Sequence, residues 1–202
     1  KNLPLVPLHG AAWWQDVTNL AYYSLATIAN GLGAAKISGI KSAVVRKADE
    51  TISAMKTSLF RYPLATFEWG SAGNVANSGV MLFYAYRFTG KVEYLKYAAE
   101  TLDFVLGRNS AGRSFITGIG VRPPVNPHHR PSGSDRWDDP VPGLVVGGPN
   151  QNMEDTAGGM RYSDTHPAEC YLDVMGSYSS NEPAINQNAP VVFLMGVLES
   201  KM

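Results

Sequence analysis

The segment from residue 107 to residue 180 constrains the fold more than any other part of the chain. Its 74 residues hold eleven of the twenty glycines and eight of the thirteen prolines. Regular helices cannot fill this stretch, because proline breaks the helical hydrogen-bond pattern and glycine weakens it. An irregular segment of this length inside a compact domain is uncommon, and an ordered one usually carries function. We therefore expect the chemistry of the protein to lie here.

The residues before this segment repeat apolar side chains at helical intervals. From Ile40, apolar residues recur at steps of three or four while charged residues fill the other face, which predicts one amphipathic helix. Two more stripes are separated by Gly90 and stopped by Gly107, which predicts a tight antiparallel hairpin. The three stripes are Val44, Ala48, Ile52, Met55 and Leu59; Val75, Gly79, Leu82, Phe83 and Tyr86; and Val92, Leu95, Ala99, Leu102 and Leu106.

Two shorter helices are expected, one near each end of the chain. The first covers about Leu20 to Ile28. The last runs from about Ala189 to Leu198, with Pro190 in its first turn and Asn188 as its N-cap. Because the apolar period is helical rather than strand-like, the expected fold class is all-α.

Composition removes several classes of protein from consideration. Seventeen basic residues balance seventeen acidic ones at a pI near 7.1, which is not the charge pattern of a nucleic-acid binder or a polybasic membrane-surface protein. No apolar run approaches the roughly 18 residues of a membrane span. The single Cys170 cannot form an internal disulfide, and the four histidines lack zinc-site spacing. We expect no nucleic-acid partner, no membrane partner and no required cofactor.

A proline-stiffened turn in the irregular segment contains His128, His129 and Arg130. The imidazole of His128 and the guanidinium of Arg130 suit hydroxyl or carboxylate groups of a bound ligand. A structural role is equally open, in which Arg130 pairs with a carboxylate and the histidines hydrogen-bond to carbonyl groups.

A second group of candidate residues lies just before the last helix. Glu182 stands where a loop enters that helix, and a carboxyl group partly shielded from water can keep its proton, as a general acid must. Asp173 is its natural companion. In the alternative, Glu182 merely suits a helix N-terminus and Asp173 is a surface or cap residue. Four aromatic residues in loop-like contexts could stack on sugars or fill gaps under loops: Trp69, Trp137, Tyr171 and Tyr178.

Two smaller motifs leave their roles open. Of Trp13 and Trp14, we expect one to pack and one to face a cleft. The run at 134–139 (SDRWDD) supplies oxygen ligands that could hold calcium as a structural ion, although its spacing is not that of an EF-hand. A solvated, salt-bridged loop is the alternative that we favour. No other metal site is expected.

Taken together, these stretches resemble glycoside hydrolase family 9, a cellulase family with an inverting mechanism and an α/α toroid of six helical hairpins. The resemblance covers at least residues 64–202 and includes the runs from Trp69 to Asn77, 106–109 and 143–150. Two sets of residues reproduce the spacing of the family signatures. The first is Ser114, Ile116, Thr117, Gly120, Arg122, Pro127, His128 and Arg130, and the second is Tyr171, Asp173, Tyr178, Glu182, Ala184, Asn188 and Ala189.

The resemblance implies a role for each candidate residue. Glu182 is implied to be the general acid, with Asp173 supporting it. The substrate-binding residues are implied to be His128 and Arg130 beside the scissile bond, Trp69 as a stacking platform, and Tyr178.

The resemblance also implies that residues 1–202 are the C-terminal half of a catalytic domain. They would form about half of the toroid, as roughly three hairpins with an uncovered apolar face, and the irregular Gly/Pro-rich segment would span 107–181. Two features depart from the family pattern: Gln187 stands where an aromatic residue is common, and the Asp-x-Gly-Asp motif of the general base is absent. An inverting enzyme needs an acid and a base about 6.5–9.5 Å apart.

We therefore expect a fragment, or one chain of a cleaved domain, that is inactive until a complementary N-terminal half supplies the base. The expected reaction is hydrolysis of β-1,4-glucosidic bonds in cellulose or related β-glucans, by a secreted, extracellular enzyme. The alternative is a non-catalytic carbohydrate-binding or scaffold fragment.

Overall fold

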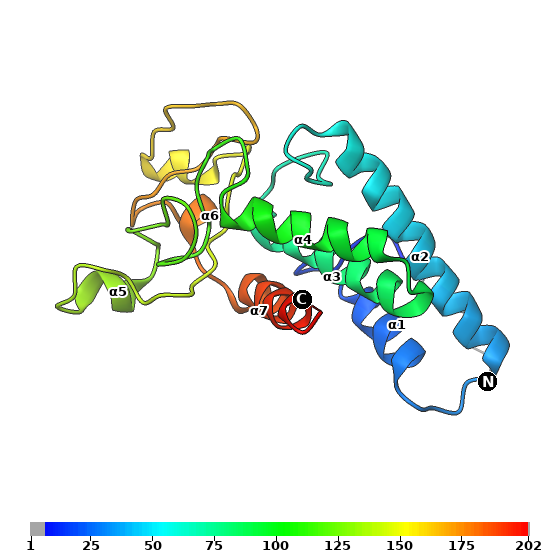
Figure 1. Ribbon diagram of the computed structural model, residues 1–202. Coiled ribbons are helices and arrows are strands. Elements are labelled where there is room, and N and C mark those ends of the chain that lie inside the picture. Colours follow the sequence, from blue (N-terminus) through cyan, green and yellow to red (C-terminus); the bar gives the residue numbers. More distant parts are fainter. Residues whose placement is uncertain (1–6, 202) are drawn as a thin grey trace.

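The computed structural model describes residues 7–201, and all regular structure in that range is helical (Figure 1). Isolated bridges replace strands in this range, which confirms the all-α expectation. No helix in it is both long and apolar enough to cross a membrane. The helices are α1 (Thr18–Thr27), α2 (Ala34–Thr57), α3 (Ser71–Thr89), α4 (Val92–Leu106), α5 (Arg130–Ser134), the 3₁₀ turn η1 (Glu154–Gly158), α6 (Tyr178–Asn181) and α7 (Ile185–Glu199).

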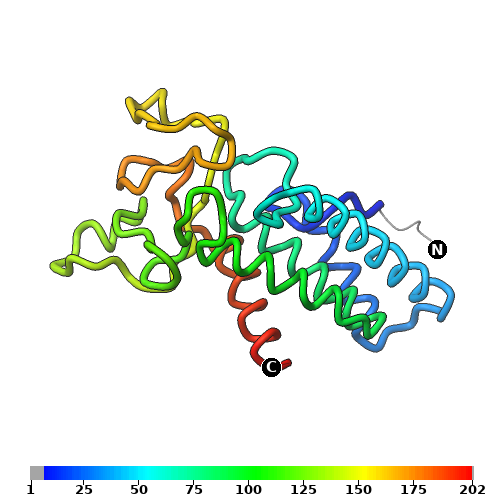
Figure 2. Tube along the Cα trace, turned by 45° about the horizontal axis from the view of Figure 1, so that its top comes forward, coloured from blue at the N-terminus to red at the C-terminus, as the bar shows by residue number. Residues whose placement is uncertain are grey.

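The helices and the irregular segment that the sequence predicted lie on two sides of the structure. The helices α1 to α4 gather on one side, and the irregular segment lies on the other, with α7 between them (Figures 1 and 2). The predicted hairpin of α3 and α4 is confirmed. Gly90 joins the two helices with φ of 71°, a left-handed conformation that glycine adopts without strain, and its N–H donates to the Tyr86 carbonyl.

Helix α3 is the centre of the bundle, because it packs against α2, α4 and α7. The small residue Gly79 allows α4 and α7 to approach α3 closely. A Cβ atom at this position would overlap the Thr101 hydroxyl of α4 and lie 2.8 Å from Leu194 Cδ1 of α7. Close packing at this one point therefore joins three helices.

Helix α2 is shorter than the apolar pattern predicted. It ends at Thr57, and Ser58 is already extended with ψ of 135°. Leu59 thus lies outside the helix and is 88% exposed, so its assignment to the buried stripe was wrong. The other four positions of that stripe are buried.

Helix α7 begins at Ile185, earlier than the pattern predicted, and Pro190 lies inside it rather than in its first turn. Asn188 is not the N-cap. Its side-chain oxygen accepts from the Val145 N–H at 3.1 Å, and its amide donates to the Gly143 carbonyl at 2.8 Å. The prediction was wrong because this side chain satisfies the backbone of a distant loop instead of its own helix.

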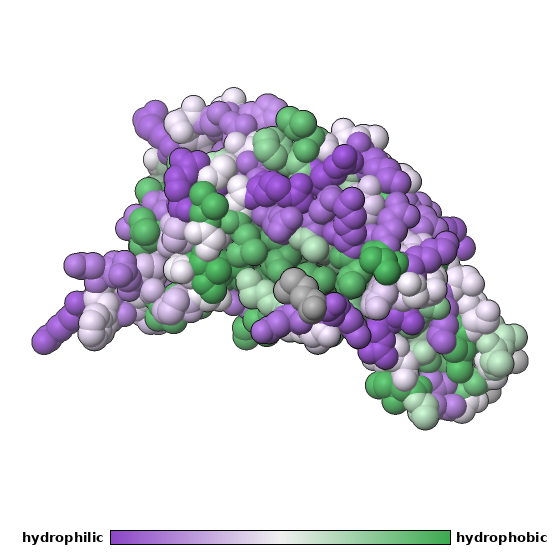
Figure 3. Space-filling view, viewed as in Figure 1, coloured by the Kyte–Doolittle hydropathy of each residue, from purple (hydrophilic) through white to green (hydrophobic). Residues whose placement is uncertain are grey.

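The bundle consists of two helix pairs and the single helix α7, so the third predicted hairpin lacks a second member among residues 7–201. An apolar flank is open, as expected. In the view of Figure 3, hydrophobic surface runs across the middle of the molecule, where α4 and α7 lie in Figure 1. On α7, Ile185 is 89% and Val192 65% exposed, while Leu95 and Leu102 of α4 are only half-buried.

The close packing at Gly79 leads to a stability prediction. Gly79→Ala should lower the free energy of unfolding by about 1–3 kcal/mol, because the new methyl group overpacks the contact with Thr101 and Leu194. Gly39→Ala in α2 is the matched control, since nothing lies within 4 Å of its Cβ position. It should stabilise the chain by about 0.5–1 kcal/mol. Urea unfolding measures both variants, and equal shifts in the same direction would contradict the packing argument.

Candidate active site

The irregular segment returns to the bundle at the N-terminal end of α3. The Ala72 N–H donates to the Gly147 carbonyl at 3.0 Å, and the Ser71 hydroxyl donates to the Pro149 carbonyl at 2.7 Å. Gly148 has φ of 80°, and a Cβ there would lie 3.0 Å from Ala72 Cβ. These contacts seat the loop at 143–150 against α3 and bring the two parts of the chain together.

A cavity of about 360 Å³ lies where this junction meets the start of α7 and the segment before α1. It brings together two predicted site residues that are distant in sequence, Trp69 and Glu182. A cavity that combines aromatic rings with one carboxyl group suits a sugar, whose ring faces are apolar and whose rim is hydroxylated. Its lining comprises Trp14, Trp69, Gly70, Gly73, Asn74, Glu182, Ala184, Asn186 and Gln187.

Aromatic rings extend from this cavity along one edge of the irregular segment. The rings of Trp69 and Tyr178 have centroids 5.5 Å apart, and the rings of Tyr178 and His128 have centroids 6.3 Å apart. The Tyr178 hydroxyl donates to the Glu154 carbonyl at 3.1 Å, which fixes its ring. Four of the six predicted site residues, Glu182 included, thus lie around one surface.

Glu182 follows directly after the short helix α6 and is half-buried. Within residues 7–201, its carboxyl group has neither a hydrogen-bond partner nor an ion-pair partner. The group is therefore free to give or take a proton at the cavity wall.

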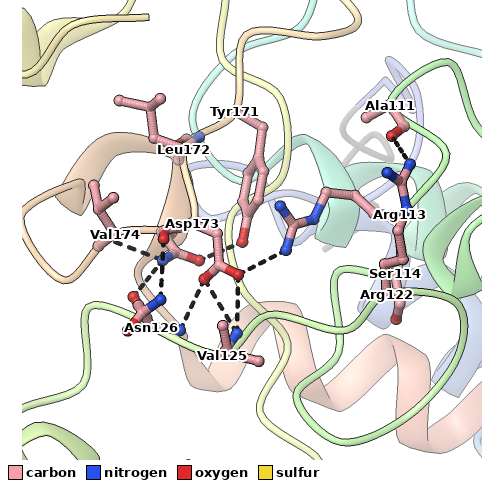
Figure 4. A network of polar contacts seen from close by, with 12 residues as sticks. Ala111, Arg113, Ser114, Arg122, Val125, Asn126, Tyr171, Leu172, Asp173 and Val174 are labelled. Atoms are coloured by element: carbon pink, nitrogen blue, oxygen red, sulfur yellow. Dashed lines mark hydrogen bonds and ion pairs between the residues drawn. The ribbon is translucent and has the colours of Figure 1, made fainter.

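Asp173 does not contact Glu182. Its carboxylate accepts hydrogen bonds from the backbone N–H groups of Val125 at 3.0 Å and Asn126 at 2.8 Å, and it pairs with Arg113 Nη2 at 2.7 Å (Figure 4). The Asp173 side chain is only 11% exposed, and these partners satisfy it. Any support that it lends to Glu182 is indirect.

Asn181 is the link between the two carboxyl groups, because it precedes Glu182 and is fully buried. Its amide donates to the Asn126 carbonyl at 2.6 Å, and its own carbonyl accepts from the His128 N–H at 2.8 Å. Its side-chain oxygen accepts from the Tyr171 hydroxyl at 2.5 Å. Burial raises the pKa of Tyr171, and the negative charge of Asp173 raises it further, so this hydroxyl remains a donor.

His128 and Arg130 differ in their surroundings, because His128 is half-buried and Arg130 is exposed. His128 Nδ1 lies 2.5 Å from the Met175 carbonyl and so carries the ring proton that it donates, which leaves Nε2 as an acceptor in the neutral ring. A hydrogen bond from His128 to a carbonyl group is what the structural role considered in the sequence analysis predicted. Arg130 is exposed at the start of α5, and its guanidinium has no partner within residues 7–201. Of the two open readings of Arg130, the structural one, in which it pairs with a carboxylate, is therefore wrong for these residues.

Trp14 and Gln187 are among the cavity residues that the sequence did not identify as site residues. Trp14 is 64% exposed and lines the cavity, while Trp13 is half-buried. Both indoles also line a neighbouring cavity beside α1, so the expected division into one packed ring and one cleft ring was wrong. Gln187 is 3% exposed and packs over the glycines at the start of α3, where a Cβ on Gly73 would lie 3.0 Å from Gln187 Cα. The sequence had singled out Gln187 only as a departure from the family pattern, in which an aromatic residue is common at this position.

The acidic run at 134–139 lies in an exposed loop, with Trp137 80% exposed. The expected salt bridges of this loop are absent from residues 7–201, so that expectation was wrong. Over the same range, no three His, Cys, Asp or Glu side chains come together as a metal site would require. Calcium binding stays a prediction.

Comparison with known proteins identifies the family. The model of glycosyl hydrolase family 9 matches residues 8–195, and the chain belongs to this family. A xyloglucan-specific endo-β-1,4-glucanase from Bacteroides ovatus is 42% identical over 166 residues, which is 80% of this chain and 28% of that protein. A cellulose 1,4-β-cellobiosidase from Acetivibrio thermocellus is 34% identical over 95% of this chain and 23% of its own length.

The fold comparison agrees with the sequence comparison. The crystal structure of the family 9 endoglucanase J30 superposes with a TM-score of 0.87 at 31% identity, covering 96% of this chain and 36% of that one. Solved relatives of this kind are (α/α)₆ barrels, of which this chain forms a part. The chain therefore spans only about a quarter to a third of the proteins that it matches.

Proposed function

We propose that this chain supplies the general acid and part of the sugar-binding surface of an extracellular β-1,4-glucan hydrolase that acts by inversion. The observation that carries the proposal is the unpaired carboxyl group of Glu182 in a cavity whose walls include Trp14 and Trp69. The named activities of the two sequence relatives, on xyloglucan and on cellulose, support a β-1,4-glucan as the substrate class.

In this proposal, Glu182 protonates the leaving glycosidic oxygen while the sugar rings stack on Trp14 and Trp69. Protonation matters because an alkoxide is a poor leaving group, and the acid removes the need to expel one. His128 offers Nε2 to a sugar hydroxyl beside Tyr178. Arg130, exposed and unpaired, is free to reach the glucan from the rim.

The second carboxylate has to come from elsewhere in the catalytic domain. Glu182 is the one acidic side chain in the lining of the cavity that residues 7–201 form. The open apolar flank over α4 and α7 agrees with a missing structural neighbour that would cover it. We propose that the complementary N-terminal part of the domain covers this flank and supplies the general base.

The first prediction concerns the proton donor. In the full-length protein, Glu182→Gln should lower kcat on an unactivated glucan by about 10²–10⁴-fold, because glutamine cannot donate the proton. On an aryl glycoside with a good leaving group the loss should be much smaller. Glu199→Gln at the far end of α7 is the matched control and should change neither rate. Equal losses on both substrates, with the fold intact by circular dichroism, would assign Glu182 to binding instead.

The second prediction concerns the stacking platforms. Trp14→Ala and Trp69→Ala should each weaken cello-oligosaccharide binding by roughly 2- to 10-fold, because each removes an aromatic face from the cavity. Isothermal titration calorimetry on the Glu182→Gln background measures binding without turnover. Trp137→Ala is the control, since this indole is also exposed but lies outside the cavity lining. An unchanged affinity in both cavity variants would remove the tryptophans from the site.

The third prediction separates an enzyme from a binding fragment. The chain alone should release no reducing sugar from β-glucan, since it lacks the base, whereas the full-length protein should. A full-length protein that binds cello-oligosaccharides and never cleaves them would favour the non-catalytic carbohydrate-binding alternative.

A further inference from the structure

Arg113 lies at one end of the hydrogen-bond network around Asp173 and is held on two sides. Its backbone carbonyl accepts from the Asn109 side-chain amide at 2.8 Å. Its guanidinium lies over the Tyr171 ring, 4.9 Å from the ring centroid, and donates to Asp173 at 2.7 Å. Only 23% of its side chain is exposed. A guanidinium that is stacked and paired in this way is a rigid anchor rather than a solvated charge.

The turn at Val125 and Asn126 is bonded to the same carboxylate that Arg113 pairs with. Its two N–H groups point at the Asp173 carboxylate, and Pro123, Pro124 and Pro127 around it have no N–H to donate. The turn leads directly to His128, whose own N–H is bonded to the Asn181 carbonyl. Asn181 in turn precedes Glu182.

We infer that Arg113 is a positioning residue: by holding Asp173, it fixes the turn at 125–126 and so sets His128 and Glu182 relative to each other. This inference rests on the proposed function, in which His128 binds the sugar that Glu182 protonates. Arg113 itself touches neither group. Its effect is transmitted through Asp173, Asn126 and Asn181.

A first measurement needs no activity. The peptide 122–128 carries few exchangeable amides because of its three prolines, so hydrogen exchange there reports the N–H groups of the turn. Arg113→Met should speed this exchange on the order of tenfold or more, because the Asp173 carboxylate loses its anchor. Arg113→Lys keeps a positive charge and should lie between Arg113→Met and the wild type.

Arg108→Met is the matched control. Arg108 also pairs with an aspartate, Asp103, but at 3.3 Å and with 43% of its side chain exposed. Its loss should leave exchange in the peptide 122–128 unchanged. Exchange that is unchanged in Arg113→Met as well, or that rises equally in both variants, would overturn the inference.

A second measurement tests coupling to the reaction in the full-length protein. Arg113→Met should lower kcat/KM on β-glucan by about 10- to 100-fold, as misplacement of a binding group does. On a His128→Ala background the same substitution should cost much less, because both changes remove one function. If the enzyme is active and the losses from Arg113→Met and His128→Ala simply add, the inference about Arg113 is overturned while the proposed function stands. A wild type that cleaves no β-1,4-glucan would overturn the proposed function and the inference with it.

Discussion

The hydrogen bonds that the Asp173 carboxylate accepts are the interaction on which the irregular half of the structure depends. A segment rich in glycine and proline has few helical or sheet partners for its backbone, so buried side chains must provide them. Asp173 does this for the N–H groups of the turn at 125–126, Asn181 for the carbonyl groups of Asn126 and Val174, and Asn188 for the loop at 143–145. These acid and amide side chains give the segment one conformation in place of many.

The bundle contributes a rigid support for this segment. Close packing around Gly79 joins α3, α4 and α7, and the loop at 143–150 is bonded to the first turn of α3. Glu182 lies between a hydrogen-bonded loop and a packed helix, α7. Its position is thus determined from both sides, as the proposed role of a proton donor requires.

The cavity is shared between segments that are far apart in the chain. Trp14 comes from before α1, Trp69 from before α3 and Glu182 from before α7. An apolar flank over α4 and α7 remains exposed in the same chain. Both features agree with the proposal that a further part of the domain closes the barrel and supplies the second carboxyl group.

The sequence by itself determined the all-α class, the hairpin at Gly90, the irregular segment and the signature residues, because helical periodicity, glycine and proline act locally. It misplaced Leu59, because helix α2 ends before it, and Asn188, because its side chain bonds to a distant loop. It could pair Asp173 with Glu182 by proximity in the chain, but only the tertiary structure assigned Asp173 to Arg113 and the turn at 125–126. Trp14 likewise became a cavity residue only in three dimensions. The reason is physical: which buried polar group meets which partner depends on how distant segments pack, and no local spacing encodes that.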